Sequence, residues 1–406
     1  MQTDTAPTRA GSHGPSGGTP PGRPAHGPQP APRARPAAGP QPAVAGRERP
    51  IRAGVLGATG YVGAELVRLL ERHPAVRIVG LAARNRDGVP VGEAFAHLAE
   101  TGHRIDPALP DASDLDVALL ALPHGQAASV APELAANGVL VIDLGADFRL
   151  SDPADYREFY GLDHPAPELL PGGPGRPASD GRVSLPAAVY GLPELHRDEI
   201  PGARIVASPG CYPTTTLLAL APLARAGLIG DVIVDAKSGV SGAGREPRLE
   251  THFSEADESV RAYGIGGHRH LPEIRGELAV LGTAAEALAG LIFTPHLIPM
   301  TRGLLSTCYV RPTRAVTQAD LDALYADAYG AEPFVQVAPA PPATKTVVGS
   351  NLCRVHVRLD ARSGRVLAMA VTDNLVKGAA GQAVQSLNIA FGLPETTGLE
   401  QLPLYP

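Results

Sequence analysis

The stretch Gly57-Ala58-Thr59-Gly60-Tyr61-Val62-Gly63 gives the first firm structural signal in the chain. The apolar run 51–56 before it predicts a short buried strand, and the pattern of residues 64–72 after it predicts a helix. Gly57 and Gly60 would let the backbone turn tightly and approach a pyrophosphate at the helix N-terminus, and Gly63 would let the helix pack closely on the strand. This order of elements predicts a dinucleotide-binding unit, while a purely structural turn is the alternative.

The end of the next predicted strand, residues 76–82, indicates which nucleotide binds. The residues inside the glycine turn, Thr59, Tyr61 and Val62, are also predicted to contact the dinucleotide. A NAD site usually has an Asp or Glu about 20 residues after the glycines, which binds the ribose hydroxyls. Here Arg84 follows the strand instead, and a guanidinium holds a 2′-phosphate that a carboxylate would repel. The sequence therefore predicts NADP(H), with a solvated loop as the alternative role for Arg84.

A third apolar run, residues 116–122, predicts another buried parallel strand, which leads into the turn Pro123-His124-Gly125. Doubly wound sheets bind ligands at the carboxyl ends of their strands, so this turn is predicted to line the cofactor site. A further predicted strand at 139–143 is followed by Arg149, whose positive charge is suited to anchor an anionic substrate. Alternating strands and helices over this region predict an α/β, Rossmann-like unit.

Cys211 lies in the stretch Ser208-Pro209-Gly210-Cys211-Tyr212-Pro213-Thr214, between a predicted strand at 203–207 and a predicted helix at 214–226. Backbone N–H groups and the helix dipole at such a turn favour negative charge, which is expected to lower the thiol pKa from about 8.5 toward neutrality. A buried, inert thiol is the alternative, and Cys308 and Cys353, inside predicted strands, are assigned to it. Cys211 is the predicted nucleophile.

A Gly- and Ser-rich loop from Ser238 to Arg245 follows a predicted strand at 231–237. Such a loop is flexible enough to fold over a ligand, so Ser238, Gly239 and Arg245 are predicted to bind a phosphate or carboxylate of the substrate. A mobile surface loop is the alternative. Asn374, at the start of a segment that leads into a long final helix at 379–391, is predicted to contact the cofactor.

Two histidines, His268 and His270, precede a helix that is predicted to start near Pro272. Histidine has a pKa that suits proton transfer at neutral pH, so one of the two is the predicted general acid/base, and the spacing does not say which. A His-x-His pair also chelates metals, but the acid-and-His spacing of a zinc peptidase is missing, so no metal is predicted.

Composition limits the remaining function classes. The chain has 406 residues, and its three cysteines do not form a disulfide framework, which predicts a reducing, cytoplasmic location. No apolar run approaches the roughly 20 residues of a membrane span. In the first 50 residues, six arginines against Asp4 and Glu48 give a charge of +4, which leaves −10 for the rest of a chain whose total is −6. That sign argues against a nucleic-acid partner. The Pro- and Gly-rich residues 1–49 are predicted to be disordered.

The chain closely resembles the N-acetyl-gamma-glutamyl-phosphate reductase family, the NADPH enzymes of arginine biosynthesis, from about residue 50 to the end. The segments that carry the resemblance, in order, are Gly57–Gly63, Ser208–Thr214, Lys237–Arg245, His268–Ile274, Pro295–Gly303 and Asp373–Gln385. The most specific are Ser208–Thr214 and the Gly-His-Arg-His-x-Pro-Glu-Ile segment. Two features depart from the family: Ala83 stands where such enzymes often have a serine for the 2′-phosphate, and the first 50 residues have no counterpart.

The resemblance implies a Rossmann-like NADP-binding domain, an α+β catalytic and dimerisation domain, and a C-terminal helix that returns to the first domain. We expect residues 50–207 with 372–406 to form the first domain, residues 208–371 to form the second, and the protein to be a homo-oligomer, either dimer or tetramer. The implied reaction reduces N-acetyl-L-glutamyl 5-phosphate, an acyl phosphate, to the 5-semialdehyde through a Cys211 thioester.

Other functions are compatible with parts of this pattern. Sister enzymes such as aspartate-semialdehyde dehydrogenase, or a reductase of aminoadipyl phosphate, would share the cysteine and the nucleotide but differ in the substrate pocket. A non-catalytic NADPH sensor would keep the glycine turn without needing the cysteine. A cysteine hydrolase would leave the glycine turn unexplained.

Overall fold

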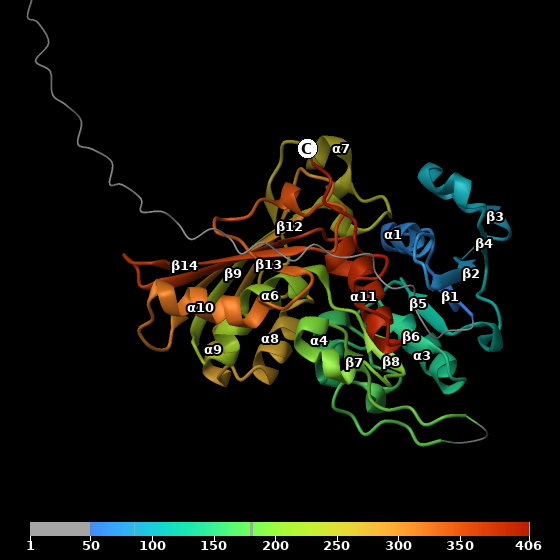
Figure 1. Cartoon of the computed structure of the whole chain (residues 1–406), viewed down its shortest axis with the longest axis horizontal. Coiled ribbons are helices and arrows are strands. Elements are labelled where there is room, and N and C mark those ends of the chain that lie inside the picture. The colour runs from blue at the N-terminus through green and yellow to red at the C-terminus, as the bar shows by residue number, and fades with distance from the viewer. Residues whose placement is uncertain (1–48, 85, 179–181, 406) are drawn as a thin grey trace, which may run out of the picture. The chain divides into compact units, whose positions relative to one another are not determined.

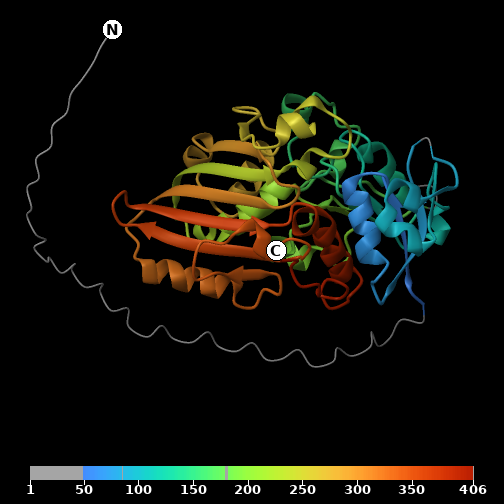
Figure 2. The same cartoon turned by 90° about the horizontal axis from the view of Figure 1, so that it is seen from above.

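The computed structural model describes residues 49–84, 86–178 and 182–405, which build two β-sheets with their helices (Figure 1, Figure 2). The extension predicted to be disordered, residues 1–49, lies outside the described residues except for Arg49. The Arg49 guanidinium forms an ion pair with Asp116, at 2.9 Å.

The first sheet has eight strands in the order β3-β4-β2-β1-β5-β6-β8-β7. All neighbouring strands are parallel except β3 and β4. Its strands are β1 (Ile51–Leu56), β2 (Val76–Ala82), β3 (Val89–Pro90), β4 (Arg104–Asp106), β5 (Val117–Leu120), β6 (Leu140–Asp143), β7 (Val189–Tyr190) and β8 (Ile205–Ala207). The central strands β5 and β6 are buried along their whole length, as expected when both faces of a parallel sheet are covered.

The first sheet is doubly wound. The chain passes from β1 through α1 (Tyr61–Leu70) to β2 in one direction, and from β5 through α3 (Ala127–Ala136) to β6 in the other. Because right-handed crossovers in opposite directions place their helices on opposite faces, α1 and α3 lie on the two sides of the sheet (Figure 1). The direction reverses between β1 and β5, so ligands are expected at the carboxyl ends of these two strands.

The glycine turn after β1 is set by two close approaches. Gly57 has a φ of +96°, and a Cβ there would lie 2.2 Å from the Ala121 carbonyl oxygen, just after β5. A Cβ on Gly63 would lie 2.3 Å from the Gly57 carbonyl oxygen. A Cβ on Gly60 would meet nothing closer than 3.5 Å. Gly57 and Gly63 are therefore needed for the fold itself, whereas the space beside Gly60 is open.

The second sheet has seven strands in the order β10-β11-β9-β12-β15-β14-β13 and mixes parallel with antiparallel pairs. Its strands are β9 (Ile229–Gly239), β10 (Arg261–Ala262), β11 (Ile292–Ile298), β12 (Leu304–Pro312), β13 (Val335–Val337), β14 (Cys353–Asp360) and β15 (Arg365–Thr372). The sequence analysis did not predict β11, because Pro295 cannot donate a ladder hydrogen bond. The predicted loop start at Ser238 was also wrong: Ser238 and Gly239 pair with β11 and end strand β9.

Helices cover one face of the second sheet, below it in Figure 1. They are α6 (Cys211–Arg225), α8 (Leu271–Val280), α9 (Ala285–Ala289) and α10 (Gln318–Tyr329). Along β12 and β14 buried residues alternate with half-buried ones, which fits a sheet with one face under helices and one face free. Cys308 and Cys353 belong to the buried set, which confirms their interpretation as core thiols.

Shorter helical segments connect these elements. They are α2 (Val91–Ala94), α4 (Pro153–Tyr160), α5 (Pro193–His196), α7 (Phe253–Ala256), and the 3-10 turns η1 (Ala96–Thr101), η2 (Ala112–Asp114), η3 (Pro167–Leu169), η4 (Arg197–Glu199), η5 (Val240–Ala243), η6 (Leu249–Thr251) and η7 (Thr344–Thr346).

The C-terminal part of the chain returns to the first sheet. After β15 it forms a π-helical turn, η8 (Val376–Ala380), and then α11 (Gly381–Ala390), which packs against α1. Figure 2 shows α11 (red) next to the blue α1. The sequence analysis predicted the final helix but not the π-turn that precedes it.

One guanidinium joins α1 to this C-terminal part. Arg302 contacts the buried Glu65 carboxylate of α1 at 2.9 Å and the buried Asp373 carboxylate at 3.4 Å. Glu65 also pairs with Arg68 on its own helix. The two sheets are thus tied by an ion cluster beside the glycine turn.

A histidine cation joins α5 to α8. The His196 ring lies between Glu199 and Glu277, with 2.7 Å from Nδ1 to the first carboxylate and 2.7 Å from Nε2 to the second. Burial acts to lower the pKa of His196, but the two carboxylates outweigh burial, and the pKa is raised. Folding therefore favours protonated His196.

We predict that the stabilisation from His196 is fully present below its unfolded-state pKa of about 6.5 and is lost as the pH rises through the raised pKa of the folded state. His196→Gln is expected to lower the free energy of unfolding by about 1–2 kcal/mol at pH 6 and by less at pH 9. Urea unfolding at the two pH values measures the difference. An equal loss at both would contradict the assignment of a cation.

Candidate active site

Cys211 is the first residue of helix α6, three residues before the predicted helix start. Its N-cap is Gly210, which follows β8 after a short turn. Cys211 is half-buried, in contrast to the fully buried Cys308 and Cys353. The turn thus presents Cys211 at a helix N-terminus, where backbone N–H groups have no partner within the helix.

The predicted low pKa of this thiol was wrong. Burial raises the pKa of Cys211 to about 11, and it outweighs the lowering effects of Arg149, the Tyr212 backbone N–H and Arg269. The prediction was based on the helix N-terminus. It did not include the desolvation of the thiol by the elements that pack over it in the folded protein. The thiol is therefore protonated at neutral pH, and a base is needed to take its proton during attack.

The carboxylate of Glu273 organises the turn before the thiol. Its Oε1 accepts hydrogen bonds from the Gly210 backbone N–H at 2.9 Å and from the Tyr190 hydroxyl at 2.8 Å, and its Oε2 lies 3.6 Å from Arg149 Nη1. Glu273 is 1% exposed. No role was predicted for Glu273, although an acid that lies one turn after His270 and directly follows Pro272 at the helix start was a usable signal.

Arg149 is directed at protein groups. The buried guanidinium donates to the Ser208 carbonyl from Nε at 2.7 Å and to the Leu144 carbonyl from Nη2 at 3.0 Å. It therefore holds the turn before Cys211 and supplies a fixed positive charge near the thiol. Its predicted role as an anchor for the substrate stays a prediction.

His270 lies directly against this turn. A Cβ placed on Gly210 would be 2.6 Å from His270 Nε2, so the ring packs on the residue before Cys211. His270 is buried, and its Nδ1 has no hydrogen-bond partner among the described residues. Burial, together with the nearby His268, Arg149, Arg269 and His124, holds the pKa of His270 well below its usual value. The ring is neutral at pH 7 and can accept a proton.

His268 lies beside His270. Its ring is 4.9 Å from the His270 ring, centroid to centroid, and its Nδ1 accepts a hydrogen bond from the His270 backbone N–H at 3.1 Å. Tyr212, Tyr263 and Phe293 surround it. Burial and the charge of Arg269 lower the pKa of His268 to about 4. The bond to the backbone makes His268 a support for the segment that carries His270.

The predicted turn Pro123-His124-Gly125 reaches the same site. Burial and the charges of Arg269 and Arg149 lower the pKa of His124 to about 3, and its buried Nδ1 also lacks a described partner. The Gly125 backbone N–H donates to Asp147 at 2.7 Å. The carboxyl end of β5 is thereby brought close to Arg149 and Arg269.

A cleft of about 470 Å³ lies beside the glycine turn. Its lining includes Tyr61 and Glu65 of α1, Phe95, Arg245, Arg302 and Leu375. Arg245 crosses it, because its guanidinium donates to the Thr59 carbonyl at 3.1 Å and to the Ala94 carbonyl at 2.9 Å and lies 4.2 Å from the centre of the Phe95 ring. The structure thus places Arg245 at the predicted cofactor turn.

Asn374 and Ser238 hold the loop that borders this cleft. Asn374 accepts from the Gly303 backbone N–H at 2.8 Å and donates to the Ser241 hydroxyl at 2.9 Å. Ser238 is buried and bonds to the Gly239 carbonyl, and a Cβ on Gly239 would be 2.7 Å from the Met300 carbonyl. These contacts fix the loop against the segment 300–303.

The region around the glycine turn fits a dinucleotide. The backbone N–H groups of Gly57 and Ala58 bond to the Ala82 carbonyl, at 2.8 and 3.1 Å, so the carboxyl end of β2 lies against the turn. Arg84 is exposed two residues beyond Ala82. The open space at Gly60, at the N-terminus of α1, suits a pyrophosphate. Val62 lies in the first turn of the same helix.

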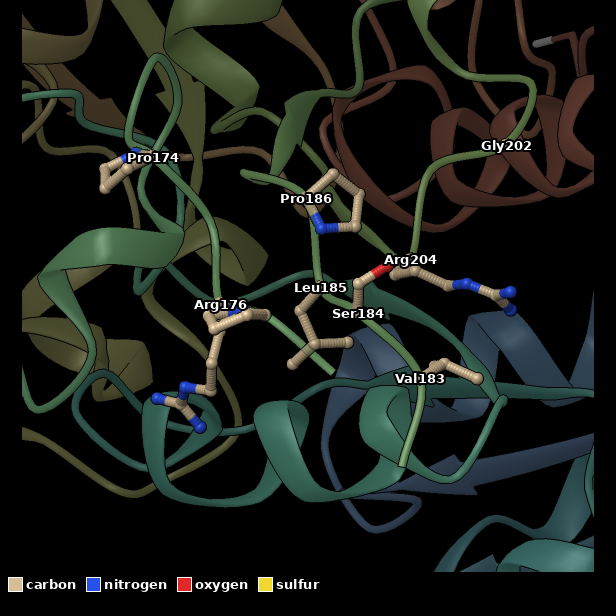
Figure 3. Close-up of a pocket in the computed structure, with 9 residues that line it drawn as sticks. Pro174, Arg176, Val183, Ser184, Leu185, Pro186, Gly202 and Arg204 are labelled. Atoms are coloured by element: carbon tan, nitrogen blue, oxygen red, sulfur yellow. The ribbon is translucent and has the colours of Figure 1, made fainter. Parts of the chain in front are cut away.

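A second hollow, of about 580 Å³, is lined by residues of two short segments, 174–177 and 183–186, and by Gly202 and Arg204 (Figure 3). The guanidinium groups of Arg176 and Arg204 point away from each other there, and Arg176 pairs with Glu168. It contains none of the predicted site residues.

Metal-binding groups and membrane-spanning helices are both missing from the described residues. Within 49–84, 86–178 and 182–405, no three His, Cys, Asp or Glu side chains form a group that could hold a metal ion. None of the described helices has the length and hydropathy of a membrane span.

Two family models match the chain. The model described as the NAD binding domain of semialdehyde dehydrogenase matches residues 52–203, and the model described as the dimerisation domain of semialdehyde dehydrogenase matches residues 211–374.

Solved structures show the same fold. Aspartate semialdehyde dehydrogenase II of Vibrio cholerae gives a TM-score of 0.61 at 19% identity, over 85% of this chain and 99% of that one. The Candida albicans aspartate semialdehyde dehydrogenase with NADP gives 0.59 at 17% identity, over 84% and 98%. At these identities the likeness establishes the fold: an NAD(P)-binding domain, a dimerisation domain and a C-terminal helix.

Relatives of much higher identity carry one shared name. An N-acetyl-gamma-glutamyl-phosphate reductase of Desulforudis audaxviator is 48% identical over 365 residues, which cover 88% of this chain and 100% of the relative. One of Janthinobacterium sp. is 46% identical with the same coverage. Since these relatives match along their entire length, the chain belongs to the N-acetyl-gamma-glutamyl-phosphate reductase family.

Proposed function

We propose that this protein uses NADPH to reduce N-acetyl-L-glutamyl 5-phosphate to N-acetyl-L-glutamate 5-semialdehyde, in the pathway to arginine. The name of its relatives, N-acetyl-gamma-glutamyl-phosphate reductase, supports the acyl phosphate substrate and its reduction. The observation that carries the proposal is the placement of Cys211. The thiol lies at a helix N-terminus, beside a turn on which a neutral buried imidazole packs. The glycine turn after β1 and the turn between β8 and Cys211 lie at the carboxyl ends of strands in the same parallel sheet.

In the first half of the reaction, Cys211 Sγ attacks the acyl carbon of the acyl phosphate. The thiol proton passes to a neutral imidazole as the S–C bond forms, since the raised pKa of Cys211 leaves little thiolate beforehand. Backbone N–H groups at the start of α6 stabilise the oxyanion, and the C–O bond to phosphate breaks to leave a thioester. The guanidinium of Arg149, held by Glu273 and Ser208, supplies positive charge to this step.

When bound, NADPH would supply the hydride that reduces the thioester carbon in the second half of the reaction. The protonated imidazole then gives its proton to the oxygen, and loss of the thiol releases the aldehyde. Gly57, Thr59, Gly60, Tyr61, Val62 and Gly63 would hold the pyrophosphate region, and Arg84 the 2′-phosphate. Pro123, His124, Gly125 and Asn374 complete the proposed cofactor contacts, and Arg149, Ser238 and Gly239 are the proposed substrate contacts. Arg245 was predicted to bind the substrate, but its guanidinium bonds to the Thr59 carbonyl, so we propose that it borders the cofactor side of the site.

Of the two histidines, we assign the acid/base role to His270. Its Nε2 is against Gly210, and its buried Nδ1 has no described partner. His268 instead accepts a bond from the His270 backbone, which is a positioning role.

The proposed assembly, domain boundaries and location rest on separate observations. A homo-oligomer, dimer or tetramer, is supported by the match of residues 211–374 to a dimerisation domain and by the half-buried free face of the second sheet. The boundaries 50–207 with 372–406 and 208–371 are supported by the break between the two sheets after Ala207. A cytoplasmic location is supported by three free thiols.

The reaction is tested by running it in reverse with N-acetylglutamate semialdehyde, phosphate and NADP. Wild-type protein should form NADPH, and Cys211→Ser should lose about a thousandfold or more in rate while NADPH still quenches protein fluorescence. Cys308→Ala is the matched control and should keep its activity. Faster turnover with aspartate semialdehyde or aminoadipate semialdehyde would identify a sister enzyme instead, and no turnover with any of the three would favour a sensor.

We predict that His270→Gln lowers kcat by about a hundredfold or more, while His268→Gln has a smaller effect. Because the base must be neutral and its pKa is lowered, kcat/KM of the wild type should stay flat through neutral pH and fall only well below the ordinary histidine pKa. A larger loss in His268→Gln would reverse the assignment. An acid limb at pH 7 would contradict the lowered pKa.

The cofactor preference is tested with Arg84→Ala. Loss of the guanidinium should raise the KM for NADPH about tenfold and leave the KM for NADH unchanged. Arg77→Ala, at the exposed amino end of the same strand, is the control and should change neither. Equal effects on both nucleotides would show that Arg84 does not contact the 2′-phosphate.

A further inference from the structure

The π-helical turn η8 has no role in the reaction described so far. π-Turns are rare, and they occur frequently at functional sites. This one is almost entirely buried, and Val376, Lys377 and Ala380 are 0% exposed. A buried π-turn interrupts regular helix packing. Its position relative to the site therefore needs an explanation.

The turn touches the nucleophile. A Cβ on Gly378 would lie 2.8 Å from the Cys211 Cβ and 3.3 Å from the Cys211 Cα. Gly378 does not have a positive φ, so glycine is needed here for space and not for backbone conformation. Its backbone N–H is held by the Asp373 carbonyl at 2.9 Å. The absence of a side chain at 378 therefore sets how closely the turn and the start of α6 approach.

The turn also touches the cofactor side of the site. η8 packs against α1, which begins at the glycine turn, as well as against α6, which begins at Cys211. Leu375, immediately before the turn, lines the cleft beside the glycine turn. One short segment is thus in contact with both helices whose N-termini form the site.

A buried ion pair fixes the turn from the other side. Lys377 Nζ lies 2.6 Å from Glu194 Oε1 and 2.8 Å from the Gln385 side-chain oxygen, and both charged side chains are 0% exposed. Gln385 also accepts from Asn351 at 3.1 Å and donates to Glu395 at 3.0 Å. A lysine enclosed in this way cannot reach a substrate, but it ties the turn to α5 and α11.

We infer that the η8 turn is a spacer that fixes the distance between Cys211 and the bound nicotinamide cofactor, with Gly378 setting the contact to the thiol residue and the Lys377–Glu194 pair holding the turn in place. This inference rests on the proposed function. Gly378, Lys377 and Glu194 are positioning residues. Hydride transfer and thiol attack are both sensitive to displacements of about 1 Å, which can cost about a hundredfold in rate.

The first test is Gly378→Ala, with Gly276→Ala as the matched control. Gly276 is also a helical glycine without positive φ, and a Cβ there meets nothing within 4 Å. In the reverse assay, Gly378→Ala should lower kcat by about a hundredfold with KM values for semialdehyde and NADP changed less than threefold. Iodoacetamide should alkylate Cys211 at least tenfold more slowly. Gly276→Ala should match the wild type in all three.

The second test removes the ion pair without leaving a lone buried charge. Lys377→Met combined with Glu194→Gln should keep the melting temperature near that of the wild type, because replacing both partners avoids an uncompensated charge. The kcat should fall about tenfold with unchanged KM. A folded double variant with wild-type kcat would overturn the role of the pair.

The two hypotheses fail in different ways. If wild-type protein turns over the semialdehyde and folded Gly378→Ala keeps both kcat and the alkylation rate, the spacer is wrong and the proposed function stands. If wild-type protein has no activity but Gly378→Ala still slows alkylation, the proposed substrate is wrong and the contact between Gly378 and Cys211 is supported.

Discussion

The buried carboxylate of Glu273 is the contact on which the site depends. It joins the Gly210 N–H before the thiol, the Tyr190 hydroxyl of the first sheet and the Arg149 guanidinium, which in turn holds the Ser208 carbonyl. Burial raises the pKa of Glu273, while Arg149, the Gly210 N–H and Tyr190 oppose that effect. Removing this carboxylate would leave Arg149 as a buried charge without its counter-ion, which is typically far more destabilising than losing a surface pair. The same contact that shapes the nucleophile turn therefore also joins the two sheets.

In this site the arginines carry the positive charge, whereas the histidines are neutral and can accept protons. Three imidazoles, those of His124, His268 and His270, have lowered pKa values and stay neutral at pH 7, mainly through burial. Arg149 and Arg269 carry positive charge near the thiol, and they help to keep the His270 imidazole neutral. A protonated histidine would attract the substrate but could not accept the thiol proton. Dividing the two tasks between arginines and histidines lets both operate at one pH.

Much of the fold could be predicted from the sequence, for physical reasons. Strand β1 and strand β2 were predicted with their observed bounds, because buried parallel strands are continuous apolar runs bounded by turns. The identity of the nucleophile candidate followed from a local strand-turn-helix pattern. The thiol pKa, the role of Glu273 and the π-turn did not follow, since each depends on segments far apart in sequence. Gly378 and Cys211, for instance, are far apart in the sequence but in contact in the structure. Strand β11 was missed for a local reason, its proline.

The ion cluster at Arg302 bears on how the molecule tolerates acid. Burial acts to raise the pKa of Glu65, but Arg302 and Arg68 outweigh it and the pKa is lowered. Its contribution to folding is thus complete above the ordinary carboxyl range and is lost only as the pH falls through the lowered value. The tie between the cofactor helix and the C-terminal segment should survive moderate acidification that would protonate most surface carboxylates. The two sheets should therefore keep their relative positions in moderate acid, even though the charge of the rest of the surface changes.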